Sequence, residues 1–271
     1  MLRDITIGQY YPAESPIHKL DPRVKLFATL IYIIALFVFK GALGFGIITV
    51  GLVAMIAVSS VPLSYILKGL KSIVVILIIT SLFNVVFTTG DIVFVKYGPF
   101  VISDAGIRNG IVIIFRLIYL IMGTSLMTLT TTPNQLTDGL ERSMRHLAKI
   151  KFPVHAIAMM MSIALRFIPI LIDETDKIMK AQMARGADFE TGGLIKRAKA
   201  MVPLLVPLFV SAFRRADDLA MAMEARCYNG GVGRTKMNPL RYGKKDAIAY
   251  IIIFAFLAAV IVARVLLPWP M

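Results

Sequence analysis

The stretch KLFATLIYIIALFVF, residues 25–39, decides the class of fold that this sequence adopts. Apart from Lys25 and Thr29 it is apolar or aromatic throughout. It comes close to the roughly 20 residues that a helix needs to cross a bilayer. Further stretches of the same character follow along the chain: 42–60, 72–89, 108–131 and 247–267. We therefore predict an all-α integral membrane protein with about five transmembrane helices.

The composition supports the same class. Hydrophobic residues make up 58% of the 271 residues, against about 45–50% in an ordinary soluble domain, and the mean hydropathy is +0.77. Lys and Arg number 30 and Asp and Glu 16, so the net charge is +14. In a membrane protein this excess indicates cytoplasmic loops facing anionic lipid. A nucleic-acid binder is the weaker interpretation, because so much apolar sequence has no role in one and the aromatic residues do not interleave with the charges.

The distribution of charge orients the predicted spans. The first 25 residues carry four Lys and Arg, and residues 132–245 carry 19, with 10 Asp and Glu. Because positive residues concentrate on the cytoplasmic side, we place the N-terminus inside and the short C-terminal tail outside. This gives three segments. Residues 1–131 hold the N-terminal tail and four spans, residues 132–245 are cytoplasmic helices, and residues 246–271 hold the last span and the external tail.

A second topology competes with this one. Residues 153–171 and 200–213 are also apolar, and both could cross the membrane as a hairpin. That hairpin would expose the six Lys and Arg of residues 172–199 to the outside, and Arg166 would cost roughly 2–3 kcal/mol inside the bilayer. We therefore expect a helical layer beneath the membrane, inserted before the last span.

One short signature occurs twice in the basic region. Residues 181–186 read AQMARG and residues 222–227 read AMEARC, and each falls in the last turn of a predicted helix. An arginine there offsets the helix dipole by roughly 0.3–1 kcal/mol, which is a sufficient structural reason for either copy alone. The repetition favours a second interpretation. Small neighbours leave each guanidinium uncovered, and its planar fork suits a carboxylate. The two ends then resemble paired contacts for two acidic surfaces.

Other motifs are absent or ambiguous. There is no Walker A loop, no catalytic arrangement of residues and no metal-ligand spacing, so we predict neither catalytic residues nor a metal site. Arg116, inside the fourth span, is either a functional residue or one that extends towards the outer face. The acidic pairs Asp173–Glu174 and Asp217–Asp218 lie close to basic residues on the same helices, and we predict intrahelical ion pairs there.

Five segments together resemble the T component (EcfT) of energy-coupling factor transporters, over almost the whole chain. They are LDPRVKL (20–26), TTTPNQLTDGLE (130–141), ALRFIPIL (164–171), AQMARG (181–186) and SAFRRADDLAMAMEARCY (211–228). The resemblance implies a non-enzymatic coupling subunit of an ABC-type importer for vitamins or trace metals, in the cell membrane. Its partners would be two cytosolic ATPases and a substrate-binding S component. It would need no cofactor, since ATP binds to the partner subunits.

The resemblance also implies site residues. Ala184, Arg185 and Gly186 would meet one ATPase, and Ala225, Arg226 and Cys227 the other, the two sets making up the ATPase-docking site. Cys227 stands where the family usually has Gly, so we expect that helix to end slightly differently. The apolar cytoplasmic helices, with Met159, Met160 and Met161, would contact the S component. The alternative function is a membrane permease with a substrate path of its own.

Overall fold

The computed structural model describes most of the chain, in two compact units. The described residues are 10–39, 41–71, 73–88, 93–97, 100–145, 152–189, 193–230, 237 and 239–266. The bundle unit joins the described residues up to Gly139 to those from Leu240 onward, and the crossed-helix unit runs from Leu140 to Pro239. The C-terminal tail, with Trp269, lies outside the described residues.

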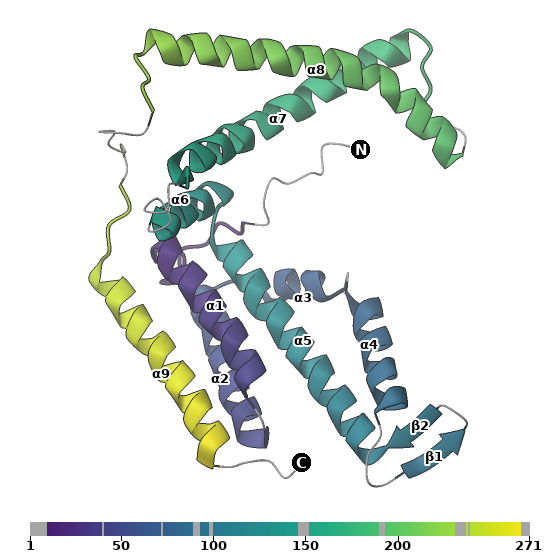
Figure 1. The fold of residues 1–271 in the computed structure, drawn as a ribbon, viewed down its shortest axis with the longest axis vertical. Helices are drawn as coiled ribbons and strands as arrows, with labels where there is room; N and C mark the ends of the chain where they lie inside the picture. Colours follow the sequence, from purple (N-terminus) through teal and green to yellow (C-terminus); the bar gives the residue numbers. More distant parts are fainter. Residues whose placement is uncertain are drawn as a thin grey trace. The chain divides into compact units, whose positions relative to one another are not determined.

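In its described residues the bundle unit contains six helices of different lengths and one β-hairpin (Figure 1). The helices are α1 (Pro22–Val38), α2 (Gly41–Ser59), α3 (Leu63–Lys71), α4 (Val74–Phe87), α5 (Asp104–Thr130) and α9 (Lys244–Leu266). The strands β1 (Val93–Tyr97) and β2 (Phe100–Ser103) pair antiparallel before α5. Helix α5 packs against α1, α2, α3 and α4, and α9 packs against α1 and α2.

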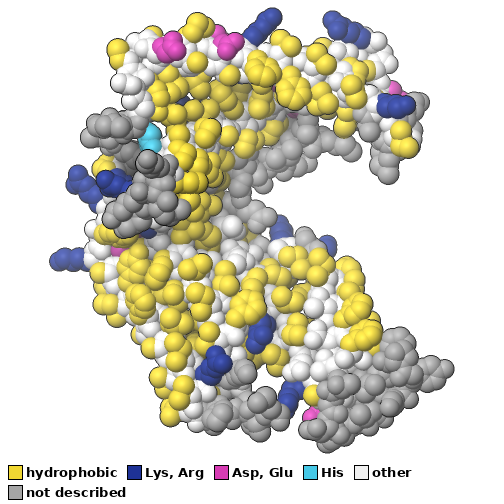
Figure 2. Space-filling model, viewed as in Figure 1, with side chains coloured by type: hydrophobic (Ala, Val, Ile, Leu, Met, Phe, Trp, Pro, Cys, Tyr) yellow, Lys and Arg dark blue, Asp and Glu magenta, His cyan; other side chains and the backbone are white. Residues whose placement is uncertain are grey.

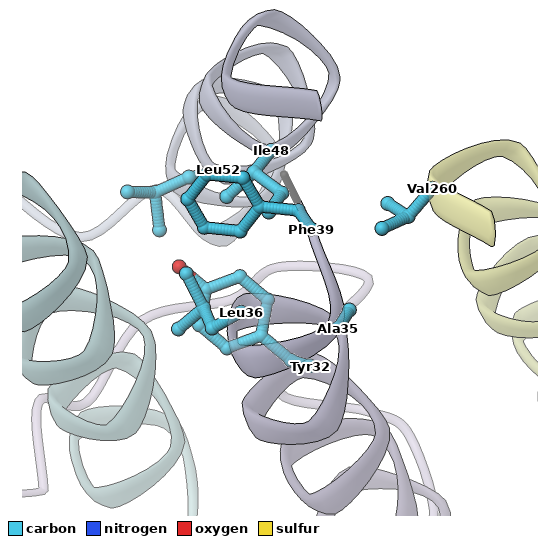
Figure 3. Close-up of a cluster of buried hydrophobic side chains, with 7 residues drawn as sticks. All are labelled: Tyr32, Ala35, Leu36, Phe39, Ile48, Leu52 and Val260. Carbon is cyan, nitrogen blue, oxygen red and sulfur yellow. The ribbon is translucent and has the colours of Figure 1, made fainter. Parts of the chain in front are cut away.

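The core of this unit lies where α1, α2 and α9 meet. Tyr32, Ala35 and Leu36 of α1, with Phe39 at its C-cap, pack with Ile48 and Leu52 of α2 and Val260 of α9 (Figure 3). The hydroxyl of Tyr32 donates to the carbonyl oxygen of Tyr119 at 2.9 Å, so its polar atom is satisfied within the helices. Such pairing is required where no water reaches the hydrocarbon region.

The segment LDPRVKL ties the start of α1 to two other helices. Asp21 caps α1 by accepting from the backbone N–H of Arg23 at 2.9 Å, and its own N–H donates to Asp246 of α9 at 2.9 Å. The Arg23 guanidinium lies 3.7 Å from the centre of the Tyr242 ring. The buried Lys25 ammonium donates to the carbonyl oxygen of Thr130, at the end of α5, at 2.7 Å. This marker segment therefore has a structural role.

The crossed-helix unit is dominated by two long helices. Helix α7 (Val154–Ala184) has 31 residues and α8 (Leu194–Ala225) has 32, and they pack against each other and cross (Figure 1). Pro169 lies inside α7, and Pro203 and Pro207 lie inside α8, where proline bends a helix. The short helix α6 (Pro133–Ser143) precedes them and straddles the boundary between the units.

The class of an all-α membrane protein is confirmed, with the small hairpin as an addition that the sequence analysis did not contain. Helices form at all five stretches predicted to span the membrane. Among the described residues, α5, α7 and α9 are each long and apolar enough to cross, and α3 with α4 forms one bent pair that also qualifies. Helix α7 meets this criterion although we predicted that it lies beneath the membrane. Its first half is apolar enough to cross, and its charged second half continues the same helix. The cytoplasmic position of residues 132–245 stays a prediction.

Candidate functional site

Helix α7 ends in a hydrogen-bonded cap at the first copy of the repeated signature. The N–H of Gly186 donates to the carbonyl oxygen of Met183 at 2.9 Å, and that of Ala187 donates to Gln182 at 3.0 Å. Gly186 has a φ of +89°, in the left-handed region. These two bonds and the left-handed residue define a Schellman motif, in which Arg185 is the C-cap.

Helix α8 ends in the same way at the second copy. The N–H of Cys227 donates to the carbonyl oxygen of Glu224 at 2.9 Å, and that of Tyr228 donates to Met223 at 3.0 Å. Cys227 takes the left-handed position with a φ of +56°, and Arg226 is the C-cap. The expectation that Cys227 would make this helix end differently is therefore wrong. The backbone adopts the glycine conformation, at a cost of roughly 1–2 kcal/mol for a residue with a Cβ atom.

Both ends present their arginine to the surroundings. Ala184, Arg185 and Gly186 are exposed, and so are Ala225, Arg226 and Cys227. Within the described parts of the chain neither guanidinium pairs with a carboxylate. The cap explains the small residue after each arginine, while nothing in the cap uses the guanidinium. Each fork is thus available for a bidentate contact with a carboxylate.

One acidic residue of α7, Glu174, is paired differently from the prediction. Glu174 of α7 accepts from Arg215 of α8 at 3.2 Å, which makes an ion pair between helices rather than within one. The prediction of an intrahelical pair for Glu174 is wrong, because sequence spacing reports neighbours along one helix and not the crossing of two. Asp173 and Arg214, the residues next to this pair, are exposed.

An apolar face accompanies the two ends. Met160 and Met161 of α7 are 58% and 42% exposed, and Met159 is half-buried. A larger set on α8 was not singled out from the sequence: Met201, Val202, Leu205, Val206, Phe209, Val210 and Phe213, all exposed. Their spacing of four residues, in two adjacent rows, is the signal that reveals one helix face. Figure 2 shows apolar side chains over much of the visible surface, α8 included.

Arg116 belongs to α5 of the bundle unit. Its guanidinium carbon is 5.1 Å from the centre of the Phe39 ring and 5.8 Å from that of Phe37. Its Nε atom is buried without a hydrogen-bond partner. Two aromatic rings at the end of α1 therefore accommodate the cation, as in other cation–π contacts.

Fold and site together define a helical membrane protein with two long crossed helices, each of which ends on an exposed arginine. The family model described as cobalt transport protein (CbiQ) matches residues 13–237. The chain is 52% identical over 266 residues to the energy-coupling factor transporter transmembrane protein EcfT of Clostridium kluyveri, covering 98% of both chains. It is 52% identical over 246 residues to EcfT of Heliobacterium modesticaldum, covering 91% of this chain and 92% of the relative.

EcfT of Bacillus subtilis is 48% identical over 247 residues, covering 91% of this chain and 93% of the relative. A match of this identity and coverage establishes membership. The chain belongs to the family of energy-coupling factor transporter transmembrane proteins, and the cobalt transport protein model also matches it over most of its length.

Proposed function

We propose that this chain is the non-catalytic coupling subunit of an energy-coupling factor importer. The observation that carries this proposal is the repeated helix end, at which the same two hydrogen bonds present Arg185 on α7 and Arg226 on α8. Two matched ends call for two matched sockets, and a pair of related ATPases supplies them. The family name supports a role in such a transporter.

The chemistry of the contact follows from the two caps. Each arginine projects from a rigid backbone turn and is flanked by alanine, so another surface can approach closely. A carboxylate on each ATPase accepts two N–H bonds from the guanidinium, an arrangement that lysine cannot reproduce. The coupling subunit itself binds no nucleotide in this proposal, since ATP binds to the partner subunits.

The exposed apolar face provides the second contact. A patch as large as that of α8 marks a surface for protein or lipid, and methionines suit a contact that adapts to its partner. We assign the α8 face and Met159–Met161 to a membrane-embedded S component, which would hold a vitamin or a trace metal. The word cobalt describes the family model and does not identify the cargo of this chain.

The proposed topology places the coupling helices next to soluble partners. The N-terminus and residues 132–245 lie in the cytoplasm, and the C-terminus lies outside. The 19 Lys and Arg of residues 132–245 support this orientation.

The test is a double charge reversal, Arg185→Glu with Arg226→Glu. Membranes that contain this variant should hold a normal amount of the protein, but the two ATPases should no longer co-purify with it and uptake should be lost. The matched control reverses two other exposed charges on the same helices, Lys180→Glu with Arg214→Glu, and should retain both ATPases. Normal ATPase retention by the first variant would reject the docking role.

The alternative function is a permease with its own substrate path, for which Arg116 is the main intramembrane candidate. Reconstitution separates the two functions. We expect vesicles that contain this chain alone to take up no substrate, and vesicles with the ATPases and an S component to show ATP-dependent uptake. Uptake by the isolated chain, abolished by Arg116→Gln, would support the permease instead.

A further inference from the structure

We infer that the Glu174–Arg215 ion pair fixes the angle at which α7 and α8 cross and thereby sets the distance between Arg185 and Arg226. We call this ion pair the pin. The inference rests on the proposed docking role of the two arginines. Arg215 Nη2 donates to Glu174 Oε2 at 3.2 Å. The side chains are 37% and 25% exposed, so the pair is partly shielded from water. It joins two helices that pack against each other where they cross (Figure 1).

The pair lies at the same distance along the chain from both helix ends. Glu174 precedes Arg185 by eleven residues, and Arg215 precedes Arg226 by eleven residues. At 1.5 Å per residue each stretch is about 16 Å long. Eleven residues are also about three turns, so each paired residue lies on nearly the same side of its helix as the arginine at the end. From the pin, the segment of α7 that leads to Arg185 and the segment of α8 that leads to Arg226 therefore have equal length. We call these segments the two arms. In each arm the arginine lies on nearly the same side of the helix as the paired residue.

Both arms are free of internal proline. Pro169 of α7 precedes Glu174, and Pro203 and Pro207 of α8 precede Arg215. Because proline removes a helix hydrogen bond and introduces a bend, every such weak point lies on the far side of the pin. From the pin to the two caps the helices run without a break, and a change of angle at the pin moves each arginine as part of a rigid arm.

The ion pair depends on both partners. The Nε atom of Arg215 is buried and has no hydrogen-bond partner, so Glu174 provides the contact that holds this guanidinium. Replacing the carboxylate would leave a partly desolvated cation without compensation. A charge swap keeps one acid and one base at the same place and is expected to restore the contact.

Spacing matters because the contact is bivalent. Two linked sites gain from each other when both can be occupied at once, and lose that gain when the geometry forbids it. An altered crossing would carry one arginine away from its socket while the other stays bound. The pin thus acts as a positioning device, and neither Glu174 nor Arg215 needs to touch an ATPase.

The experiment measures the distance between the two ends in the full chain, purified in lipid nanodiscs without partners. Spin labels are attached to the native Cys227, which is exposed and the sole cysteine, and to Ala181→Cys in the last turn of α7. We expect a single narrow distance distribution. Glu174→Arg and Arg215→Glu should each broaden and shift it, and the combined swap should restore it.

The neighbours of the pair provide matched controls. Asp173→Arg and Arg214→Glu make the same charge changes one residue away and should leave the distribution unchanged. Single reversals that leave the distribution as it was, or a swap that fails to restore it, would overturn the pin.

ATPase co-purification separates this inference from the proposed function. We expect each single reversal at the pin to lose ATPase retention and the swap to regain it. Retention by the single reversals despite altered distances would overturn the positioning role. Retention by Arg185→Glu with Arg226→Glu would reject docking itself, while the distance measurement would still decide whether the pin exists.

Discussion

The two units differ in how many of their apolar side chains they bury. The bundle unit buries a continuous cluster between α1, α2 and α9. In the described part of the crossed-helix unit the buried apolar residues are Val154, Ala158 and Leu204, while Phe213 of α8 remains 69% exposed. The bundle has its own packed core, whereas the apolar face of α8 is exposed within the crossed-helix unit, and we propose that it serves assembly. Substitutions should therefore affect folding in the first unit and assembly in the second.

The largest predicted effect breaks the bundle at Gly123. A Cβ atom there would overlap the ring of the buried Tyr32, so Gly123→Ala should destabilise the protein by about 3 kcal/mol. Gly46→Ala is the matched control, since open space surrounds Gly46 on α2. The fraction that stays monodisperse in gel filtration after heating measures the difference. Equal thermal stability of the two variants would contradict the tight packing of α1 on α5.

A smaller loss is expected at Lys25, where the bundle holds a buried ammonium. Its Nζ donates to the carbonyl oxygens of Thr130 at 2.7 Å and His18 at 3.2 Å. Lys25→Met leaves both acceptors unpaired, which should cost about 1–3 kcal/mol. Lys19→Met, which removes only an exposed ion pair with Glu14, should change little. The same heating assay compares them, and equal losses would show that burial of Lys25 carries no special weight.

In the crossed-helix unit, the left-handed residues Gly186 and Cys227 should determine the local stability of the two helix ends. Open space surrounds Gly186, so Gly186→Ala suffers only from its left-handed backbone and should lose about 1 kcal/mol of local stability. Cys227→Gly should gain about as much, because Cys227 already occupies that conformation. Hydrogen exchange of the last turns of α7 and α8 reports both changes. Changes of the same sign would contradict the shared cap.

The smallest predicted effect is the pH dependence of stability that His18 causes, just before α1 of the bundle. Burial lowers the pKa of His18 below 6.5, with the nearby Lys25 acting in the same direction and a hydrogen bond to Tyr11 opposing them. The unfolded chain then binds the proton more readily than the folded one. Stability should be constant above pH 6.5, fall as the pH drops below it, and level off beneath the folded pKa. His18→Gln should flatten this profile, and an unchanged profile would contradict the burial effect.

Sequence reasoning succeeded where a feature is local. Long apolar runs located α1, α2, α4, α5 and α9, and the repeated Ala-Arg signature located two helix ends, because capping depends on adjacent residues. It failed where distant segments meet. The Glu174–Arg215 pair depends on the crossing of α7 and α8, and the hairpin of β1 and β2 depends on pairing between two short segments for which no strand was predicted. The α8 face was visible as four-residue spacing but was not counted.

The most direct measurement of the central claim uses the native thiol of Cys227, the residue after Arg226 at the exposed end of α8. A photoactivatable crosslinker attached to Cys227 in the assembled transporter should label a cytosolic ATPase at high yield. Arg226→Glu should abolish that adduct while the labelled protein stays in the membrane. An adduct formed with membrane subunits alone, or an ATPase adduct that survives Arg226→Glu unchanged, would contradict the account.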